Sequence, residues 1–277
     1  MNLPKVSVIM GIYNCEDTLP VAIDSIVNQT YQNWELIMCD DGSTDNTYSV
    51  AQKYKEKYPE KVKLIKNEKN LGLNCTLNRC LEECTGDYVA RMDGDDISAP
   101  DRFAAEVDFL NEHPEYSIVS TPMIYFDENG VWGEGHAIEK PQIRDFVFHA
   151  PFHCHAPCMI RTEAYRKVGG YTEDTRLLRF EDCNLWYKLY AAGYRGYNIQ
   201  RPYYMMRDDR NAMNRRTFSS RMRAVYVQWI GFRLVKMPAR YYVFLLFMLI
   251  KGIVLGFLPS SVYTFLHKMK IKHSIPF

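Results

Sequence analysis

The first 92 residues alternate short apolar runs with helical patterns, and this alternation restricts the possible folds more than any other feature of the sequence. Strands are predicted at Val6–Met10, Trp34–Met38, Val62–Lys66 and Asp87–Met92, with a helix between each strand and the next. Short polar connections join them. Repeated units of this kind favour an α/β fold, in which a parallel sheet carries helices on both faces.

The pattern is less regular after residue 99. The elements predicted there are helices at Pro100–Asn111, at Thr162–Val168 and from Phe180 onward, a strand at Ser117–Ser120 and a hairpin turn at Asn129-Gly130. The chain is long enough to bury a substantial core. Its length is compatible with one large domain or two small ones.

Two clusters of acidic residues follow predicted strands. Asp40 and Asp41 come after Trp34–Met38, and Asp93-Gly94-Asp95-Asp96 comes after the strand that ends at Met92. Neighbouring carboxylates repel each other, so a cation or hydrogen-bond donors are expected beside them. In parallel sheets ligands bind beyond the carboxyl ends of the strands, where both clusters are predicted to lie. A solvated turn is the alternative for the second cluster, since Asp and Gly are common in turns.

Carboxylate oxygens suit hard cations such as Mg²⁺ or Mn²⁺, which take few protein ligands while a phosphate supplies others. A metal-bound diphosphate is therefore the ligand that the acidic clusters favour. The sequence has no GxGxxG after the first strand and no GxxxxGK[ST], which excludes the simplest dehydrogenases and P-loop proteins. A nucleotide held by carboxylates and a metal is the remaining interpretation.

Six segments, taken in order, resemble the motifs of family 2 of the glycosyltransferases. They are Val6–Asn14, Asp40–Asp45, Asn70–Gly72, Gly86–Val89, Asp93–Asp96 and Glu181-Asp182. The resemblance implies the GT-A fold, an α/β fold with a mixed, mostly parallel central sheet and helices on both faces. The resemblance covers roughly residues 4–205. It implies an inverting enzyme that moves a sugar from a nucleotide-sugar donor, a UDP-sugar in the first place, to a saccharide acceptor, with Mn²⁺ or Mg²⁺ as cofactor.

The resemblance also implies which residues bind the nucleotide. Asp41 would accept a hydrogen bond from the uracil imide. Gly11, Tyr13 and Asn14 would line the base and ribose pocket, and Asp93 would lie near the ribose.

Metal binding and catalysis are assigned in the same way. Asp95 would be the metal ligand that bridges to the diphosphate, and Asp96 would assist it. Asp182 would be the catalytic base, which takes the proton of the acceptor hydroxyl as the new bond forms. An acid in the first turn of a helix also complements the helix dipole, which is the alternative role for Asp182 and for its neighbour Glu181.

The sequence departs from the family pattern at two points. Many relatives carry Arg where this chain has Leu77, so one contact near the donor is in question. The QxxRW signature of processive synthases is absent, which favours addition of one sugar per encounter. We expect a catalytic domain over residues 1–207, with a nucleotide-sugar half at about 1–98 and an acceptor half at about 99–207.

The near-neutral total charge hides two halves of opposite sign. All 33 acidic residues lie at or before Asp209, whereas about 12 of the 34 basic residues follow it, so the first 209 residues carry about −11 and the rest about +12. No nucleic-acid-binding motif accompanies the basic residues, which argues against a nucleic-acid partner. We predict instead that residues 208–277 form a helical tail that associates with a membrane surface.

The tail contains an apolar run from Tyr241 to Leu258, interrupted by Lys251, Gly252 and Gly256. Interfacial or re-entrant insertion, a single membrane span and a soluble core or dimer-forming helix are the three interpretations. Basic residues flank the run on both sides and favour anionic lipid on the cytoplasmic face. An enzyme attached there suggests a lipid-linked oligosaccharide acceptor, in the synthesis of a surface polysaccharide or a lipooligosaccharide.

Other features support an intracellular chain and leave two rival functions. The run Val6–Met10 is too short for a secretory signal, so we expect a cytoplasmic enzyme attached to the inner face of the cell membrane. The eight cysteines show no CxxC pair and are expected to be free. The segment from His153 to Cys158, with His149 upstream, lacks the second ligand pair of a structural zinc site. A sugar nucleotidyltransferase and a non-catalytic nucleotide-binding scaffold remain the alternatives.

Overall fold

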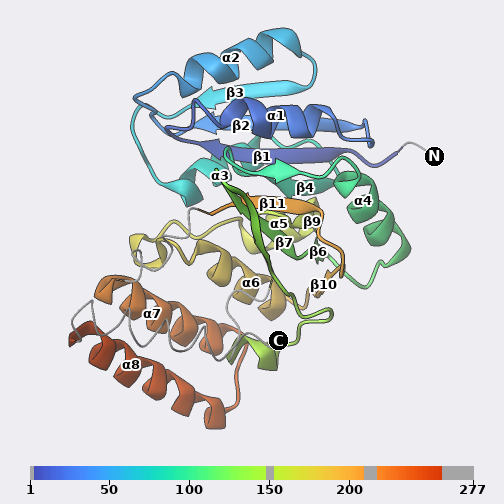
Figure 1. Cartoon of the computed structure of the whole chain (residues 1–277). Helices are drawn as coiled ribbons and strands as arrows, with labels where there is room; N and C mark the ends of the chain where they lie inside the picture. Colours follow the sequence, from blue (N-terminus) through green and yellow to red (C-terminus); the bar gives the residue numbers. More distant parts are fainter. Residues whose placement is uncertain (1–2, 148–152, 209–216, 258–277) are drawn as a thin grey trace.

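The predicted strand and helix units form a seven-stranded sheet in the computed structural model, which describes residues 3–147, 153–208 and 217–257 (Figure 1). Its strands are β1 (Val6–Ile12), β2 (Trp34–Asp40), β3 (Val62–Lys66), β4 (Tyr88–Arg91), β6 (Ile118–Ser120), β9 (Met159–Arg161) and β10 (Gly196–Asn198). Their order is β10-β6-β9-β4-β1-β2-β3. Only β9 runs antiparallel to its neighbours among these described strands, so the predicted mixed, mostly parallel sheet is confirmed.

Helices pack on both faces of this sheet because alternate residues of each strand point to opposite sides. Val8 and Met10 of β1 belong to one core cluster, and Ile9 belongs to the other. The first cluster holds α1 (Leu19–Val27), α2 (Thr47–Lys57) and α4 (Arg102–Glu112). The second holds α3 (Leu73–Glu82), α5 (Thr162–Val168) and α6 (Glu181–Ala191).

A smaller four-stranded sheet has the order β5-β11-β7-β8. Its strands are β5 (Ile97–Ser98), β7 (Met123–Asp127), β8 (Gly130–Glu134) and β11 (Tyr204–Arg207). Strands β7 and β8 form the hairpin predicted at Asn129-Gly130. Because β11 pairs with β5, a segment near residue 205 lies directly beside the acidic cluster that precedes β5.

Strands β1 and β2 are each two residues longer than predicted. In their parallel register Gly11 pairs with Cys39 and Ile12 with Asp40, so backbone pairing continues two residues past each predicted strand end. Asp40 is therefore the final residue of β2, and Asp41 begins the loop. Gly11 and the first acidic pair consequently lie at one edge of the sheet.

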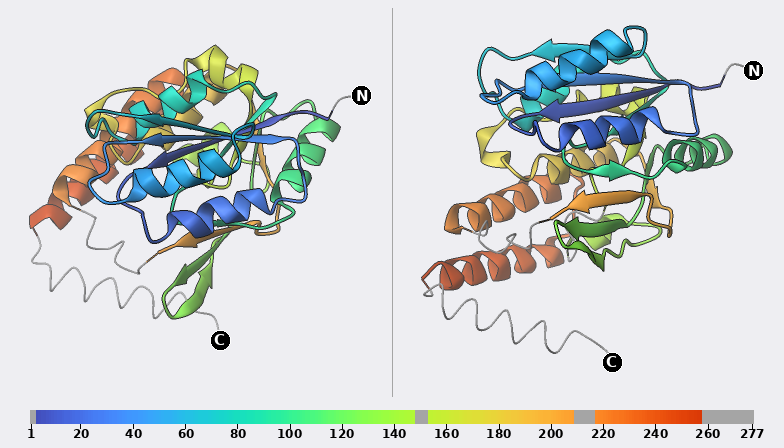
Figure 2. Two further views of the ribbon diagram at one scale, coloured as in Figure 1. Left: turned by 90° about the horizontal axis from the view of Figure 1, so that it is seen from above. Right: turned by 45° about the horizontal axis from the view of Figure 1, so that its top comes forward.

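The C-terminal part described by the structure is a pair of helices, α7 (Phe218–Leu234) and α8 (Tyr242–Phe257), joined by the short 3₁₀ helix η4 (Ala239–Tyr241). Two further 3₁₀ helices are η1 (Ile143–Val147) and η2 (Thr175–Leu177). Both views in Figure 2 place α7 and α8 at the end of the molecule away from the N-terminus. Leu258 and the basic residues at 268, 270 and 272 lie outside the described residues.

Helix α7 packs tightly on α6. Val227 and Phe232 of α7 are buried, and a Cβ atom on Gly231 would overlap the ring of Tyr187. Glycine is therefore required where these two helices approach each other. Within the described residues, no helix combines the length and the apolar character that crossing a membrane demands.

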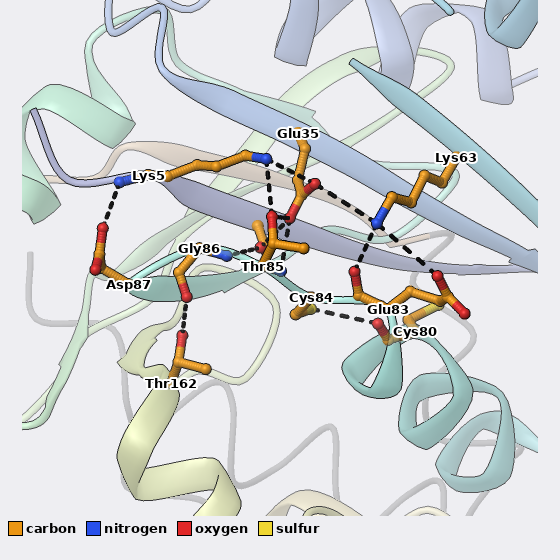
Figure 3. Close-up of polar contacts among 11 residues, drawn as sticks. Lys5, Glu35, Lys63, Cys80, Glu83, Cys84, Thr85, Gly86, Asp87 and Thr162 are labelled. Carbon is orange, nitrogen blue, oxygen red and sulfur yellow. Dashed lines mark hydrogen bonds and ion pairs between the residues drawn. The ribbon is translucent and has the colours of Figure 1, made fainter. Parts of the chain in front are cut away.

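A buried carboxylate ties three strands together at the edge of the sheet opposite the acidic clusters (Figure 3). Glu35 of β2 accepts hydrogen bonds from Lys5 Nζ at 2.9 Å, from Ser7 Oγ at 2.6 Å, and from both the backbone N–H and the hydroxyl of Thr85 at 2.8 Å. Burial by itself would raise the pKa of Glu35, but the hydrogen bonds from Ser7, Lys5 and Thr85 outweigh it and lower the pKa to about 2. This network fixes the strands whose other ends carry the candidate site.

Candidate active site

A cavity of about 460 Å³ opens where β1 and β4 end. Five of the residues predicted for the site line it: Gly11, Tyr13, Asn14, Asp93 and Asp95. They come from segments about 80 residues apart, which the parallel pairing of β1 with β4 brings together. The predicted position beyond the carboxyl ends of the strands is therefore where these residues meet.

The end of β1 forms one wall of this cavity. A Cβ atom on Gly11 would lie 3.0 Å from Cδ1 of Leu73, so a larger residue would narrow the cavity at this point. Asn14 has a φ of 47°, a left-handed conformation that Asn tolerates better than most residues. Its side-chain oxygen accepts a hydrogen bond from the backbone N–H of Thr44 at 2.9 Å, which fixes the loop after β2. The side chain of Tyr13 is 47% exposed and offers a ring for stacking.

Asp41 lies beneath the neighbouring loop and is only 4% exposed. Its Oδ1 accepts hydrogen bonds at 2.8 Å from Asn67 Nδ2 and from the backbone N–H of Leu71, and its Oδ2 accepts one at 3.0 Å from the backbone N–H of Gly72. Asp41 is not among the residues that line the cavity. Hydrogen-bond donors thus meet this carboxylate, as expected for adjacent acids. These contacts leave one lone pair of Oδ2 unused.

Asp40 is fully buried and uses different donors. Its Oδ2 accepts a hydrogen bond from the backbone N–H of Ser43 at 3.3 Å, while its Oδ1 has no hydrogen-bond partner within the described chain. The two neighbouring acids therefore accept hydrogen bonds from separate groups.

The second acidic cluster divides between the cavity and the interior. Asp93 and Asp95 line the cavity, whereas Asp96 is 2% exposed and accepts a hydrogen bond from the backbone N–H of Arg207 at 2.8 Å. Burial, followed by the charge of Asp93, raises the pKa of Asp95. Burial, with the charges of Asp93 and Asp95, raises the pKa of Asp96 to about 8. A cation beside these carboxylates would relieve their repulsion.

The ligand set fits a hard divalent cation. Across 3–147, 153–208 and 217–257, no three or more His, Cys, Asp or Glu side chains are grouped so that they could hold a metal ion by themselves. An ion at Asp95 would therefore take most of its ligands from a diphosphate and water. This is the usual way in which Mg²⁺ binds with one or two carboxylates and substrate phosphates.

Asp182 lies in the first turn of α6, outside the lining of the donor cavity. It is partly buried, and its Oδ1 accepts a hydrogen bond from the backbone N–H of Cys183 at 2.7 Å. Burial raises its pKa, while the Cys183 N–H and the charge of Arg91 oppose that rise. Asp182 thus accepts a hydrogen bond at the N-terminus of the helix, as an acid with a purely structural role would. Its raised pKa also suits a general base.

Arg91, which our sequence analysis did not single out, connects these parts of the site. It is 6% exposed, lines the cavity and donates from Nη2 to both carboxylate oxygens of Asp93, at 2.7 and 3.1 Å. It also contacts His155, and its charge acts on Asp182. Its position, a charged residue at the end of a buried strand, is the sequence signal that could have identified Arg91. Arg207 also lines the cavity, but no sequence signal indicated it, since only the pairing of β11 with β5 brings it there.

The histidines near residue 155 belong to the core. Burial lowers the pKa of His153 to about 4 and lowers that of His155 well below its usual value. His155 Nε2 lies 2.8 Å from the hydroxyl of Tyr171, and His153 Nδ1 lies 3.0 Å from Asn198 Oδ1. Both rings therefore stay neutral and hold the strands that surround Arg91. His149 lies outside the described residues.

The departure at Leu77 also has a structural basis, since this side chain is fully buried in the core rather than in the donor cavity. Its neighbour Asn78 accepts a hydrogen bond from the backbone N–H of Tyr171 at 2.8 Å and donates one to the Tyr171 carbonyl at 2.9 Å. Helix α3 is thereby fastened to the segment that leads into α6.

A mostly parallel sheet with an acid-lined nucleotide-sized cavity at the strand ends defines the GT-A class of nucleotide-sugar transferases. The model of the family described as glycosyl transferase family 2 matches residues 7–169, more than half of the sequence. The chain belongs to this family and is a glycosyltransferase.

Two curated relatives cover most of this chain. A Bacillus subtilis (strain 168) glycosyltransferase, EpsE, is 42% identical over 268 residues, which are 97% of this chain and 95% of EpsE. An Escherichia coli protein is 33% identical over 221 residues, 77% of this chain and 78% of its own. It is named UDP-Gal:alpha-D-GlcNAc-diphosphoundecaprenol beta-1,3-galactosyltransferase.

Solved structures share the fold. S. aureus TarS in complex with UDP-GlcNAc has a TM-score of 0.63 at 19% identity, covering 87% of this chain and 73% of the TarS chain. The Pyrobaculum calidifontis mannosyltransferase PcManGT, in complex with GDP-Man and Mn²⁺, has a TM-score of 0.63 at 21% identity, covering 96% of this chain and 80% of its own. The predicted GT-A fold and family 2 membership are thus confirmed.

Proposed function

We propose that this glycosyltransferase moves a single sugar from a UDP-sugar to a lipid-linked saccharide at a membrane surface, with inversion at the anomeric carbon. The observation that carries the proposal is the cavity in which the end of β1 meets Asp93 and Asp95. The UDP-GlcNAc complex of TarS and the lipid-linked acceptor in the name of the E. coli relative support the choice of donor and acceptor.

The donor would lie along the edge of the sheet. Tyr13 would stack on the base, Asp41 would accept its imide hydrogen bond, and Asp93, held by Arg91, would bind the ribose. Asp95 would hold Mn²⁺ or Mg²⁺ with assistance from the Asp96 carboxylate, and the ion would neutralise the charge that develops on the departing diphosphate. The exposed ring of Tyr13 and the ion pair of Asp93 with Arg91 support these roles.

Asp182 would complete the site from the acceptor side. It would remove the proton of the acceptor hydroxyl while that oxygen attacks the anomeric carbon and the bond to the diphosphate breaks. Attack from the face opposite the leaving group inverts the configuration.

Metal dependence tests the assignment of Asp95. We expect Mn²⁺ to strengthen UDP binding to the wild type, and the Asp95→Asn variant to lose this gain, with affinity in Mn²⁺ at least about tenfold weaker, because the bridge between carboxylate and diphosphate is gone. Isothermal titration calorimetry with and without Mn²⁺ measures both. Asp17→Asn removes the same charge from the same cavity and serves as the control. Loss of the metal effect in Asp17→Asn alone would refute the assignment.

The outer face of α8 supports attachment to the cytoplasmic surface of the membrane. Its exposed apolar side chains recur at helical spacing and form one stripe: Val243, Leu246, Phe247, Ile250, Ile253 and Val254. Arg240 and Lys251 accompany this stripe. A helix that packs on the protein with one face and exposes an apolar stripe on the other can lie in the membrane interface, where apolar burial and anionic lipid would hold it.

Charged substitutions test this attachment better than deletion of the tail, because deletion would uncover the buried contacts of α7 with α6. We expect the double variant Phe247→Glu/Ile250→Glu to bind phosphatidylglycerol vesicles at least about tenfold more weakly than the wild type. Two apolar side chains that would be buried in the membrane are replaced by charged ones. Vesicle co-sedimentation measures this. Ser49→Glu/Gln52→Glu adds the same charges on α2 as a control. Unchanged binding of the α8 variant would exclude the attachment.

A further inference from the structure

An apolar cavity of about 650 Å³ lies between α7, α8 and the segments before α6. It is separate from the donor cavity, and the two share no lining residue. The cavity is lined by Phe146 and Val147 of η1, by Phe180 directly before α6, by Ala224, Val227 and Gln228 of α7, and by Val243, Phe244, Phe247 and Met248 of α8. Its size is within the range of about 300–1,000 Å³ that is typical of small-molecule sites.

The lining is almost entirely hydrocarbon. Gln228 is the one polar side chain among the residues that line it, and its amide donates to the carbonyl of Phe146, so it offers little to a polar ligand. Apolar surface in contact with water is unfavourable, and an occupant made of hydrocarbon would remove it.

One end of the cavity is close to the catalytic part of the site. Phe180, which lines the cavity, is the residue before α6, and Asp182 follows two residues later. The side chain of Phe180 packs in a small cluster with Leu177, Cys183 and Val227. An occupant of the cavity would therefore reach the first turn of α6, where the proposed base lies.

The other end meets the apolar stripe of α8. Val243 and Phe247 line the cavity and are also 61% and 62% exposed. The cavity wall is thus continuous with the face that we propose contacts the membrane. A chain anchored in the membrane could enter the cavity along these residues without crossing water.

Two arginines are adjacent in sequence to residues that line the cavity. Arg179 directly precedes Phe180, and Arg223 directly precedes Ala224. Neither of these arginines takes part in an ion pair within the described residues. Arginine is well suited to binding phosphate, since its planar guanidinium donates two parallel hydrogen bonds. The surroundings thus suit a ligand with an apolar tail and a diphosphate head.

We propose that this cavity binds the isoprenoid chain of the lipid carrier on which the acceptor saccharide is built. This inference rests on the proposed function, because it requires a lipid-linked acceptor. The tail would lie between α7 and α8, the diphosphate would bind near Arg179 and Arg223, and the acceptor sugar would extend toward Asp182. The cavity would then select the carrier as well as the sugar attached to it.

Two diphosphates that differ only in tail length test the proposal. We expect the full-length protein to bind farnesyl diphosphate at least tenfold more tightly than isopentenyl diphosphate, as measured by calorimetry below the micelle concentration of farnesyl diphosphate. Ala224→Trp, which fills the cavity from α7, should abolish this difference. Ile250→Trp places the same ring on an exposed position of α8 outside the cavity and should preserve it. Should Ala224→Trp fail to fold, Val243→Trp fills the cavity from a largely exposed position.

The outcomes separate this inference from the proposed function. Equal affinities for the two diphosphates, or a tail preference that survives in the cavity-filling variants, would overturn the inference. A tail preference that appears only after residues 258–277 are removed would also overturn it, since the chain's own segment would then be the occupant. UDP binding with Mn²⁺, measured on the same samples, tests the proposed function by itself, because the substituted residues lie outside the donor cavity.

Discussion

Asp182→Asn is expected to lower sugar transfer by about 10²- to 10⁴-fold while leaving UDP binding essentially unchanged. General-base catalysis contributes roughly 10² to 10⁴-fold, and an amide cannot accept the proton of the acceptor hydroxyl. Asparagine keeps the shape of the side chain and can still accept the hydrogen bond from the Cys183 N–H. UDP should bind normally, since Asp182 is not part of the lining of the donor cavity.

Release of UDP from a panel of UDP-sugars, with Mn²⁺ and a lipid extract as the source of acceptor, measures this effect. Glu181→Gln is the matched control, because Glu181 is the adjacent acid in the same helical turn and burial raises its pKa as well. Full loss of transfer in Glu181→Gln, with activity retained in Asp182→Asn, would show that the base is assigned to the wrong residue.

The pH dependence of transfer provides a second test of the same residue. Burial is the largest influence on Asp182 and raises its pKa, so the base is protonated at a higher pH than an ordinary Asp. In a plot of transfer rate against pH, the fall in rate on the acidic side should therefore occur at a pH above the ordinary Asp pKa of about 3.9. Because the Arg91 charge opposes the rise in pKa, Arg91→Met should move this fall in rate to still higher pH.

The sequence predicted the first half of the sheet well because its signals are local. Each strand from β1 to β4 is an apolar run followed by polar residues, and each helix between them repeats its apolar residues at helical spacing. The acidic clusters follow directly from this pattern, since strand ends in a parallel sheet share one edge. The cavity lined by Gly11, Tyr13 and Asp95 was therefore predictable.

The remaining parts of the site depend on pairings between distant residues, which leave no local pattern. Asp95 and Asp96 are neighbours in sequence, but β11 supplies the backbone N–H of Arg207 that draws Asp96 into the interior. The antiparallel insertion of β9 between β4 and β6 likewise places His155 beside Arg91. The sequence could not distinguish the roles of adjacent acids, because those roles are set by strands more than 60 residues away.

The tail illustrates a similar limit. The charge asymmetry and the apolar run predicted a membrane-associating segment, and this stays a prediction. The close packing of Gly231 on Tyr187 was not predictable, because both residues look ordinary in sequence. This contact joins α7 to α6, the helix that carries Asp182 in its first turn.

The largest change in stability is expected on substitution of Glu35, which lies far from the candidate active site. Glu35→Gln should lower the free energy of unfolding by about 3 kcal/mol at pH 7, since one pKa unit corresponds to about 1.4 kcal/mol and the pKa of Glu35 falls from 4.5 to about 2 on folding. The amide would also place a donor toward the Lys5 ammonium, which now donates to the Glu35 carboxylate at 2.9 Å. Urea denaturation followed by circular dichroism measures the change.

The sign of the pH effect distinguishes this network from a simple packing defect. Between the unfolded value of 4.5 and the folded value of about 2, the unfolded chain binds more protons at Glu35, so the stability that this residue contributes is lost as the pH falls through that window. The stability difference between wild type and Glu35→Gln should therefore be greatest above pH 5 and shrink steadily toward pH 3. Glu60→Gln, at an exposed position, should show almost no difference at any pH. If the difference in the free energy of unfolding between wild type and Glu35→Gln stayed constant with pH, the lost stability would come from packing. The carboxylate charge would then not be what holds β1, β2 and the start of β4 together.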